Sequence, residues 1–177
     1  AVTLGSATDI AAVTGSISAS TAVTAPTPAF QQSKLVIANP VTEAPSSITY
    51  IFALNSPLET STPDTIALLL PDFGFTSPLG AASMSTGCGS TTFTTSFANT
   101  GAATATLTLS AGSATLNAYQ ECAVTIATGV TTGNSAQDAN WSGRTAAVTL
   151  NAVADISAVK VTTSTALVAT ALSTSAL

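Results

Sequence analysis

Short stretches in which apolar residues alternate with Thr or Ser recur along the 177-residue chain, and Gly, Pro, Asn or Ser residues separate them. In TATLTLS, for example, Ala105, Leu107 and Leu109 lie on one side of an extended chain and the threonines on the other. This alternation is typical of a strand with one buried and one solvated face. It predicts seven strands, at Lys34–Ala38, Ser47–Leu54, Thr65–Leu70, Thr91–Phe97, Thr104–Ser110, Cys122–Thr128 and Arg144–Asn151.

Seven short strands with turn residues between them predict an all-β fold, an immunoglobulin-like antiparallel β-sandwich. Helices are disfavoured because the alanines are interleaved with β-branched residues, and only the Ala-rich tail from Ser164 to Leu177 could form a short helix. The segment Gly15–Ala29 is rich in Ser, Thr and Pro, and its prolines favour an extended path. We interpret it as a linker or interdomain strand, with a surface loop as the alternative. The expected organisation is a terminal strand and linker at 1–29, a sandwich domain at 30–160 and a connecting segment at 161–177, the two end segments linking to neighbouring units.

The start of the chain is nearly repeated close to its end: AVTLGSATDIAAV begins at Ala1 and AVTLNAVADISAV at Ala147, an offset of 146 residues. Some identities are expected by chance in a chain rich in Ala and Thr, but both copies contain Asp-Ile, and Asp is rare here. We expect either tandem repetition or structural equivalence of the two stretches; two end strands that merely look alike are the alternative. Ala1–Ser18 is then predicted to be extended and paired with a sheet.

Charged residues make up only 6% of the chain, with a net charge of −5, no histidine and a mean hydropathy of +0.50. Because charge keeps monomers apart, such a surface favours contact with copies of the same protein, or a coat of glycans. The three cations, Lys34, Arg144 and Lys160, are too few for a nucleic-acid interface. The longest aliphatic run, Ile66–Leu70, is far shorter than the ~20 residues of a membrane-spanning helix. We therefore expect no nucleic-acid partner and no transmembrane segment, and any signal peptide lies outside the chain or has been removed.

Two cysteines and one sequon are the clearest candidates for chemistry. Cys88 and Cys122 lie in no CxxC motif and have no histidine to complete a zinc site, so we expect one disulfide, with two free buried thiols as the alternative. Asn140-Trp141-Ser142 is an N-glycosylation sequon, which makes Asn140 a candidate glycan site. Both features indicate an extracellular protein, secreted or on the cell surface.

The remaining polar residues suggest no reactive site. The acidic residues are scattered, no calcium-binding loop is present, and without histidine neither a Ser-His-Asp nor a Cys-His arrangement can form. We therefore expect no enzymatic activity, no catalytic residue, no cofactor and no metal. Lys34 is interpreted as a lysine that protects a strand edge, the alternative being a crosslink to an asparagine. Trp141 is expected to cover one end of the core, with ligand stacking as the alternative.

The stretch SSITYIFALNSPLETSTPDTIALLLPDFGFTS, followed by GCGSTTFTTSFANTGAATATLTLSAGSATLNAYQECAVTIATGV, resembles a repeated domain of very large secreted proteins of algae and related protists. The shared pattern is an aliphatic strand that ends in a Leu70-Pro71-Asp72-Phe73 turn, then a cysteine and Thr-rich strands, and it covers roughly Lys34 to Asn151. The resemblance implies a β-sandwich module of an extracellular fibre or cell-surface coat, such as the mastigonemes of algal flagella.

The predicted function is therefore a structural subunit or repeat unit of a self-assembling extracellular filament, with copies of itself as partners. One alternative is a pilin-like subunit that polymerises by donor-strand exchange. Another is an adhesin or carbohydrate-binding module, which would need an aromatic platform from Trp141, Tyr50 and Tyr119.

Overall fold

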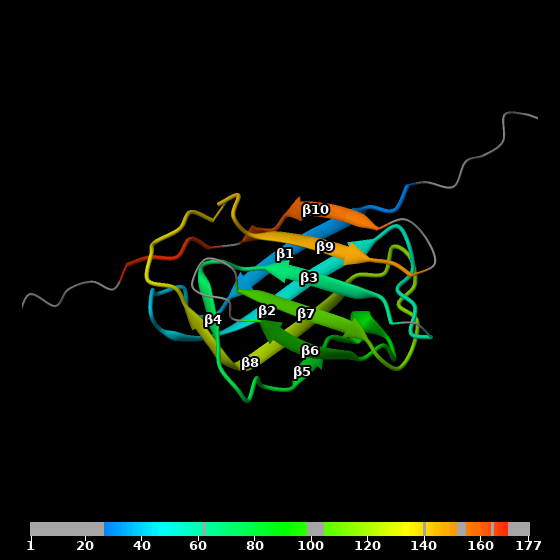
Figure 1. Ribbon diagram of the computed structural model, residues 1–177, viewed down its shortest axis with the longest axis horizontal. Coiled ribbons are helices and arrows are strands. Elements are labelled where there is room, and N and C mark those ends of the chain that lie inside the picture. Colours follow the sequence, from blue (N-terminus) through cyan, green and yellow to red (C-terminus); the bar gives the residue numbers. More distant parts are fainter. Residues whose placement is uncertain are drawn as a thin grey trace, which may run out of the picture.

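A computed structural model of the chain describes residues 27–61, 63–98, 105–139, 141–151, 155–163 and 165–169. These residues form two β-sheets that pack face to face (Figure 1). Within them no α-helix occurs, and one short 3-10 turn, η1, spans Thr86–Cys88. The all-β prediction is confirmed.

The strands divide into a mixed sheet and an antiparallel sheet. The mixed sheet has the order β11 (Thr162–Thr163), β1 (Phe30–Ile37), β2 (Pro45–Leu54), β8 (Cys122–Thr132) and β4 (Phe73–Phe75), and β5 (Ala82–Met84) also pairs with β8. The antiparallel sheet has the order β10 (Ile156–Lys160), β9 (Thr145–Thr149), β3 (Thr65–Leu69), β7 (Thr106–Ala111) and β6 (Phe93–Ala98).

All seven predicted strands are present, with their ends moved by a few residues. The strands β4, β5, β10 and β11 were not predicted. The immunoglobulin-like topology stays a prediction at this point, because β4 and β5 precede β6 and β7 in the chain and lie in the opposite sheet.

The mixed sheet curls where β8 bends. Gly129 has a φ of 81°, and the pairing of β2 with β8 shifts register between Ser46 and Ile48. A Cβ on Gly129 would lie 3.0 Å from the carbonyl oxygens of Thr76 and Pro78, so only glycine fits there. The bend lets β5 pair with β8 before Gly129 and β4 pair with β8 after it.

The antiparallel sheet follows the predicted alternation closely. In β7, Leu107 and Leu109 are buried while Thr106, Thr108 and Ser110 are partly exposed. The outward positions of β9, β3, β7 and β6 carry no charged side chain; they are Thr145, Ala147, Thr149, Thr65, Ala67, Leu69, Thr106, Thr108, Ser110, Thr94, Ser96 and Ala98.

The core lies between the two sheets and includes aromatic contacts that join them. Phe52 of β2 meets Phe93 of β6 edge to face with 5.8 Å between ring centroids, and Phe75 of β4 lies 5.9 Å from Phe97 of β6. Burial of each large aliphatic or aromatic side chain contributes about 1.5–3 kcal/mol. The core therefore forms from the apolar faces that the alternation predicted.

The end of the described chain crosses from one sheet to the other. After β10, the fully buried Val161 leads into β11, which pairs in parallel with β1 at Lys34 and Leu35. The chain then makes isolated bridges from Leu167 to Gln137 and from Val168 to Val41. The described part of the tail is thus extended and not helical.

The two ends of the described chain lie at opposite ends of the long axis of the domain (Figure 1). Residues 1–26 lie outside the described residues, and so does the expected pairing of Ala1–Ser18 with a sheet. The proposed equivalence of the two repeated stretches therefore stays a prediction.

Candidate interaction site

The predicted disulfide between Cys88 and Cys122 is confirmed. Cys88 ends η1 and Cys122 begins β8; their Cα atoms are 4.4 Å apart and both side chains are buried. Hydrogen bonds hold the same junction, because the backbone N–H of Ala123 donates to Ser85 Oγ at 3.1 Å and Gln120 Nε2 donates to the carbonyl oxygen of Gly87 at 2.7 Å. The bridge therefore ties the loop before β6 to β8, the strand of the mixed sheet that pairs with β2, β4 and β5.

The candidate glycan site and the aromatic candidates do not come together as one site. Asn140 lies outside the described residues. Tyr50 is buried in the core, whereas Tyr119 is 65% exposed, so these two rings cannot share one exposed platform. Trp141 is half-buried and its ring lies over the guanidinium of Arg144, at 5.8 Å. Trp141 therefore covers a buried charge, an arrangement that neither expectation for this residue included.

Lys34 does not lie at a free strand edge. β11 pairs with β1 on that side, with Lys34 opposite Thr162. The expectation that Lys34 protects an exposed edge is therefore wrong, because the chain returns from the other sheet to cover β1 there.

A buried ion pair, which sequence reasoning missed, joins Arg144 to Asp72. Arg144 is fully buried; its Nε and Nη2 both donate to Asp72 Oδ2, at 2.8 and 2.5 Å. Its Nη1 donates to the carbonyl oxygen of Asp138 at 3.3 Å and to Thr163 Oγ1 at 3.1 Å. Asp72 Oδ1 is buried and has no hydrogen-bond partner among the described residues. Two features of the sequence could have suggested this pair. They are the single arginine and the aspartate of the Leu70-Pro71-Asp72-Phe73 turn.

Two other acidic side chains order turns. Asp64 Oδ2 accepts the backbone N–H of Glu59 at 2.7 Å and Asp64 Oδ1 accepts that of Asn151 at 2.8 Å. Asp155 Oδ1 accepts the backbone N–H of Leu150 at 2.9 Å, which closes the connection between β9 and β10. These carboxylates are therefore structural.

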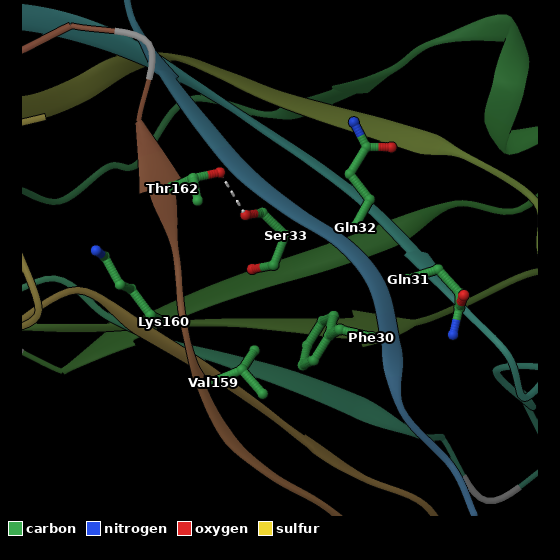
Figure 2. A pocket seen from close by; sticks show the side chains of 7 residues that line it. All are labelled: Phe30, Gln31, Gln32, Ser33, Val159, Lys160 and Thr162. Carbon is green, nitrogen blue, oxygen red and sulfur yellow. Dashed lines mark hydrogen bonds between the residues drawn. The ribbon is translucent and has the colours of Figure 1, made fainter. Parts of the chain in front are cut away.

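A groove of about 390 Å³ lies between the first half of β1 and β10, where the edges of the two sheets diverge (Figure 2). Phe30 and Val159 point toward one another across it, whereas Gln31 and Gln32 point away. At its end Thr162 Oγ1 donates to the carbonyl oxygen of Ser33 at 3.0 Å, and the Ser33 hydroxyl is 3.0 Å from the hydroxyl of Tyr50. Burial raises the pKa of the Tyr50 phenol well above its ordinary value, and the hydrogen bond with Ser33 opposes this to a smaller extent.

The groove is better suited to binding an extended polypeptide than to catalysing a reaction. Lys160 is the one titratable group among its lining residues. Only Lys34 and Leu35 of β1 pair with β11, so among the described residues no strand pairs with Phe30 to Ser33 on that side. An unpaired strand edge beside apolar side chains can accept an added strand.

The described residues contain neither a candidate metal site nor a membrane-spanning helix. In the described ranges no three acidic, Cys or His side chains gather in a way that could hold a metal ion. Those ranges also contain no helix long and apolar enough to cross a membrane. Comparisons of the chain with protein-family profiles, with curated protein sequences and with solved structures found no match.

Proposed function

We propose that this chain is a structural module of an extracellular self-assembling filament or cell-surface fibre, in which it acts as a repeat unit or subunit and transmits tension from one end to the other. The observation that carries the proposal is the path of the chain. It enters the domain at one end of the long axis and leaves at the other (Figure 1). The first and last described strands, β1 and β11, pair in parallel.

This path places the bonds that join β1 and the loop after it to residues 162–168, called the closing segment here, in shear under tension. Pulling on the two ends moves β1 and residues 162–168 in opposite directions along their common axis. Two groups of bonds then resist together. The first joins β1 to β11 and includes the bond from Thr162 Oγ1 to the Ser33 carbonyl oxygen. The second joins the loop after β1 to Val168, from the Thr42 N–H to the Val168 carbonyl oxygen and from the Val168 N–H to the Pro40 carbonyl oxygen. Bonds loaded together withstand more force than bonds that peel one at a time, which suits a fibre module.

Three other features support the same function. A disulfide favours an oxidising compartment. An uncharged outer sheet face offers little repulsion to a neighbouring copy. The pairings β1–β2, β2–β8, β8–β5, β3–β9 and β9–β10 match the A–B, B–E, E–D, C–F and F–G neighbours of an immunoglobulin domain, and we propose an immunoglobulin-like sandwich in which β6 and β7 are added beside β3.

Antibody labelling on the source cells tests the function. Gold-conjugated antibodies raised against the purified chain are expected to decorate filaments or a coat outside intact cells, as seen by electron microscopy. Pre-immune serum and antibody absorbed with the purified chain serve as controls. Labelling confined to the cell interior would refute the proposal.

Force spectroscopy tests the mechanical part. The full chain, held at residues 1 and 177, is expected to unfold at a higher force than the same chain held at Asn55 and Tyr119, which flank the Tyr119 N–H bond to Leu54 at one edge of the structure. Thr42→Pro removes the N–H that bonds Val168 and is expected to lower only the first force. Equal forces in the two geometries would contradict the tension path.

Donor-strand polymerisation is a second candidate, favoured by the unpaired edge of β1 beside the groove. It predicts that the filament separates in denaturant into chains of one module. A filament that keeps a covalent mass many times that of one module would exclude it.

A further inference from the structure

The structure explains which residues of the 147–169 stretch matter for the fold. Five apolar side chains of this stretch are buried; they are Val148, Leu150, Ile156, Val161 and Leu167. Asp155 closes the β9–β10 connection through its bond to the Leu150 N–H. By contrast, Asn151, Ser157 and Lys160 are exposed.

Residues 1–13 keep the buried positions of the described module end. At the offset of 146, Val2, Leu4 and Ile10 correspond to Val148, Leu150 and Ile156, and Asp9 corresponds to the closing Asp155. Of the five differences, the two that fall at described positions, Gly5 for Asn151 and Ala11 for Ser157, are at exposed ones. Every buried apolar position of the described part of 147–159 therefore has the same residue in the first copy.

The correspondence continues beyond the first thirteen residues. With two extra residues, Gly15 and Ser16, the offset becomes 144, and Ile17 and Val23 then correspond to the buried Val161 and Leu167. Ser20-Thr21-Ala22 is also identical to Ser164-Thr165-Ala166. The added residues fall where the chain of the described module crosses between its sheets, a connection that tolerates insertion.

We infer that residues 1–25 are the end of a further copy of this module, equivalent to residues 147–169, and that Pro26–Ala29 joins this copy covalently to the described module. The inference rests on the proposed function and deepens it, because it selects a tandem repeat unit over a separate subunit. Four residues span at most about 14 Å, and two of them are prolines, which restrict the backbone. Successive modules, each of about 144–146 residues by the two offsets, are therefore held close together by a stiff connection.

An exchange of segments tests the inference in the full chain. In the first variant, residues 147–169 are replaced by the sequence of residues 1–25. In the second, residues 147–159 are replaced by residues 1–13, which changes five residues and adds none. The control replaces 147–169 by residues 1–25 in reverse order; its composition is identical, but it places Thr24, Ala22 and Ser16 where Val148, Leu150 and Ile156 were buried.

Both exchanges are expected to form the disulfide and to unfold cooperatively on heating. The first is expected to lose about 4–8 °C in Tm, since Ile17 and Val23 each differ from the replaced residue by one methylene. The reversed control is expected to lose its cooperative transition.

Each other outcome overturns part or all of the inference. If the second exchange unfolds, residues 1–13 are no copy of the module end. If only the first exchange fails to fold, residues 14–25 do not continue the copy. The connection between modules then does not begin at Pro26. If the reversed control folds as well as the exchanges, the correspondence has no structural meaning. These results are separate from the antibody test, because separate subunits can also form an extracellular filament.

Discussion

Replacing Asp72 with alanine is expected to cause a large loss of stability, because it leaves Arg144 buried without a counter-ion. The guanidinium is fully buried, and two of its donors, Nε and Nη2, bond only to Asp72 Oδ2 among the described residues. Removing one partner of a buried ion pair costs about 3–5 kcal/mol, most of it the penalty of the charge left behind. For a chain of this size each kcal/mol corresponds to about 2–4 °C, so the expected fall in Tm is about 6–20 °C.

Urea unfolding of the oxidised protein measures this loss. Trp141 is the one tryptophan and lies over the Arg144 guanidinium, so its fluorescence reports the environment of the pair directly. Asp138→Ala is the matched control. Asp138 is exposed and contacts Arg144 through its main-chain carbonyl oxygen, so its carboxylate should contribute less than about 0.5 kcal/mol.

A double variant separates the cost of an unpaired charge from the loss of packing. Asp72→Leu with Arg144→Met replaces both charges by apolar groups and is expected to recover most of the stability lost in Asp72→Ala. The reasoning is refuted if Asp72→Ala unfolds within 1 kcal/mol of the unchanged chain. It is refuted equally if the double variant is less stable than the single one, since the uncompensated guanidinium would then not be the cause.

Three further outcomes are expected in the same unfolding assay. Changing Cys88 and Cys122 together to alanine should cost about 4 kcal/mol, because the bridge closes a loop with a sequence separation of 34, and a reducing agent should then have no further effect. Gly129→Ala should cost more than about 1 kcal/mol, because the residue has a positive φ and no space for a Cβ, whereas the same change at the open Gly74 should cost less. Tyr50 keeps its proton in the folded state above pH 10, where the unfolded chain loses it, so stability should fall as pH rises past about 10; Tyr50→Phe should lack this fall, and an unchanged alkaline slope would contradict the assignment.

The alternation of apolar and polar residues predicted those strands that have one buried face. In β7 every second residue is buried, and β2 and β8 follow the same rule over most of their length. β10 was missed because only Ile156 of its five residues is buried, which leaves no alternation to detect. β11 was missed because it has two residues and exists only through its pairing with β1, 128 positions away at Lys34 and Thr162. A pairing at that distance leaves no periodicity in the chain.

Among the candidate sites too, the sequence predicted some features and missed others. Counting cysteines was enough to predict the bridge, since two cysteines without histidine leave few alternatives. The ion pair was missed because its partners are 72 residues apart and the acidic residues were judged only as ligands or catalysts. The groove was not foreseen either, because it forms between β1 and β10, which belong to different sheets and pair with other strands.

The position of the ion pair connects the stability of the module with its proposed mechanical role. Asp72 follows β3, and Arg144 precedes β9 and accepts the Val161 N–H on its carbonyl oxygen at 2.9 Å. The same guanidinium donates to Thr163 Oγ1 in β11, the strand that pairs with β1. One buried cation therefore joins the antiparallel sheet to the segment through which the chain leaves the domain. If the module bears tension as proposed, this ionic contact lies where the load would pass from the sandwich into the closing segment, so Asp72→Ala should weaken that anchorage as well as the global fold.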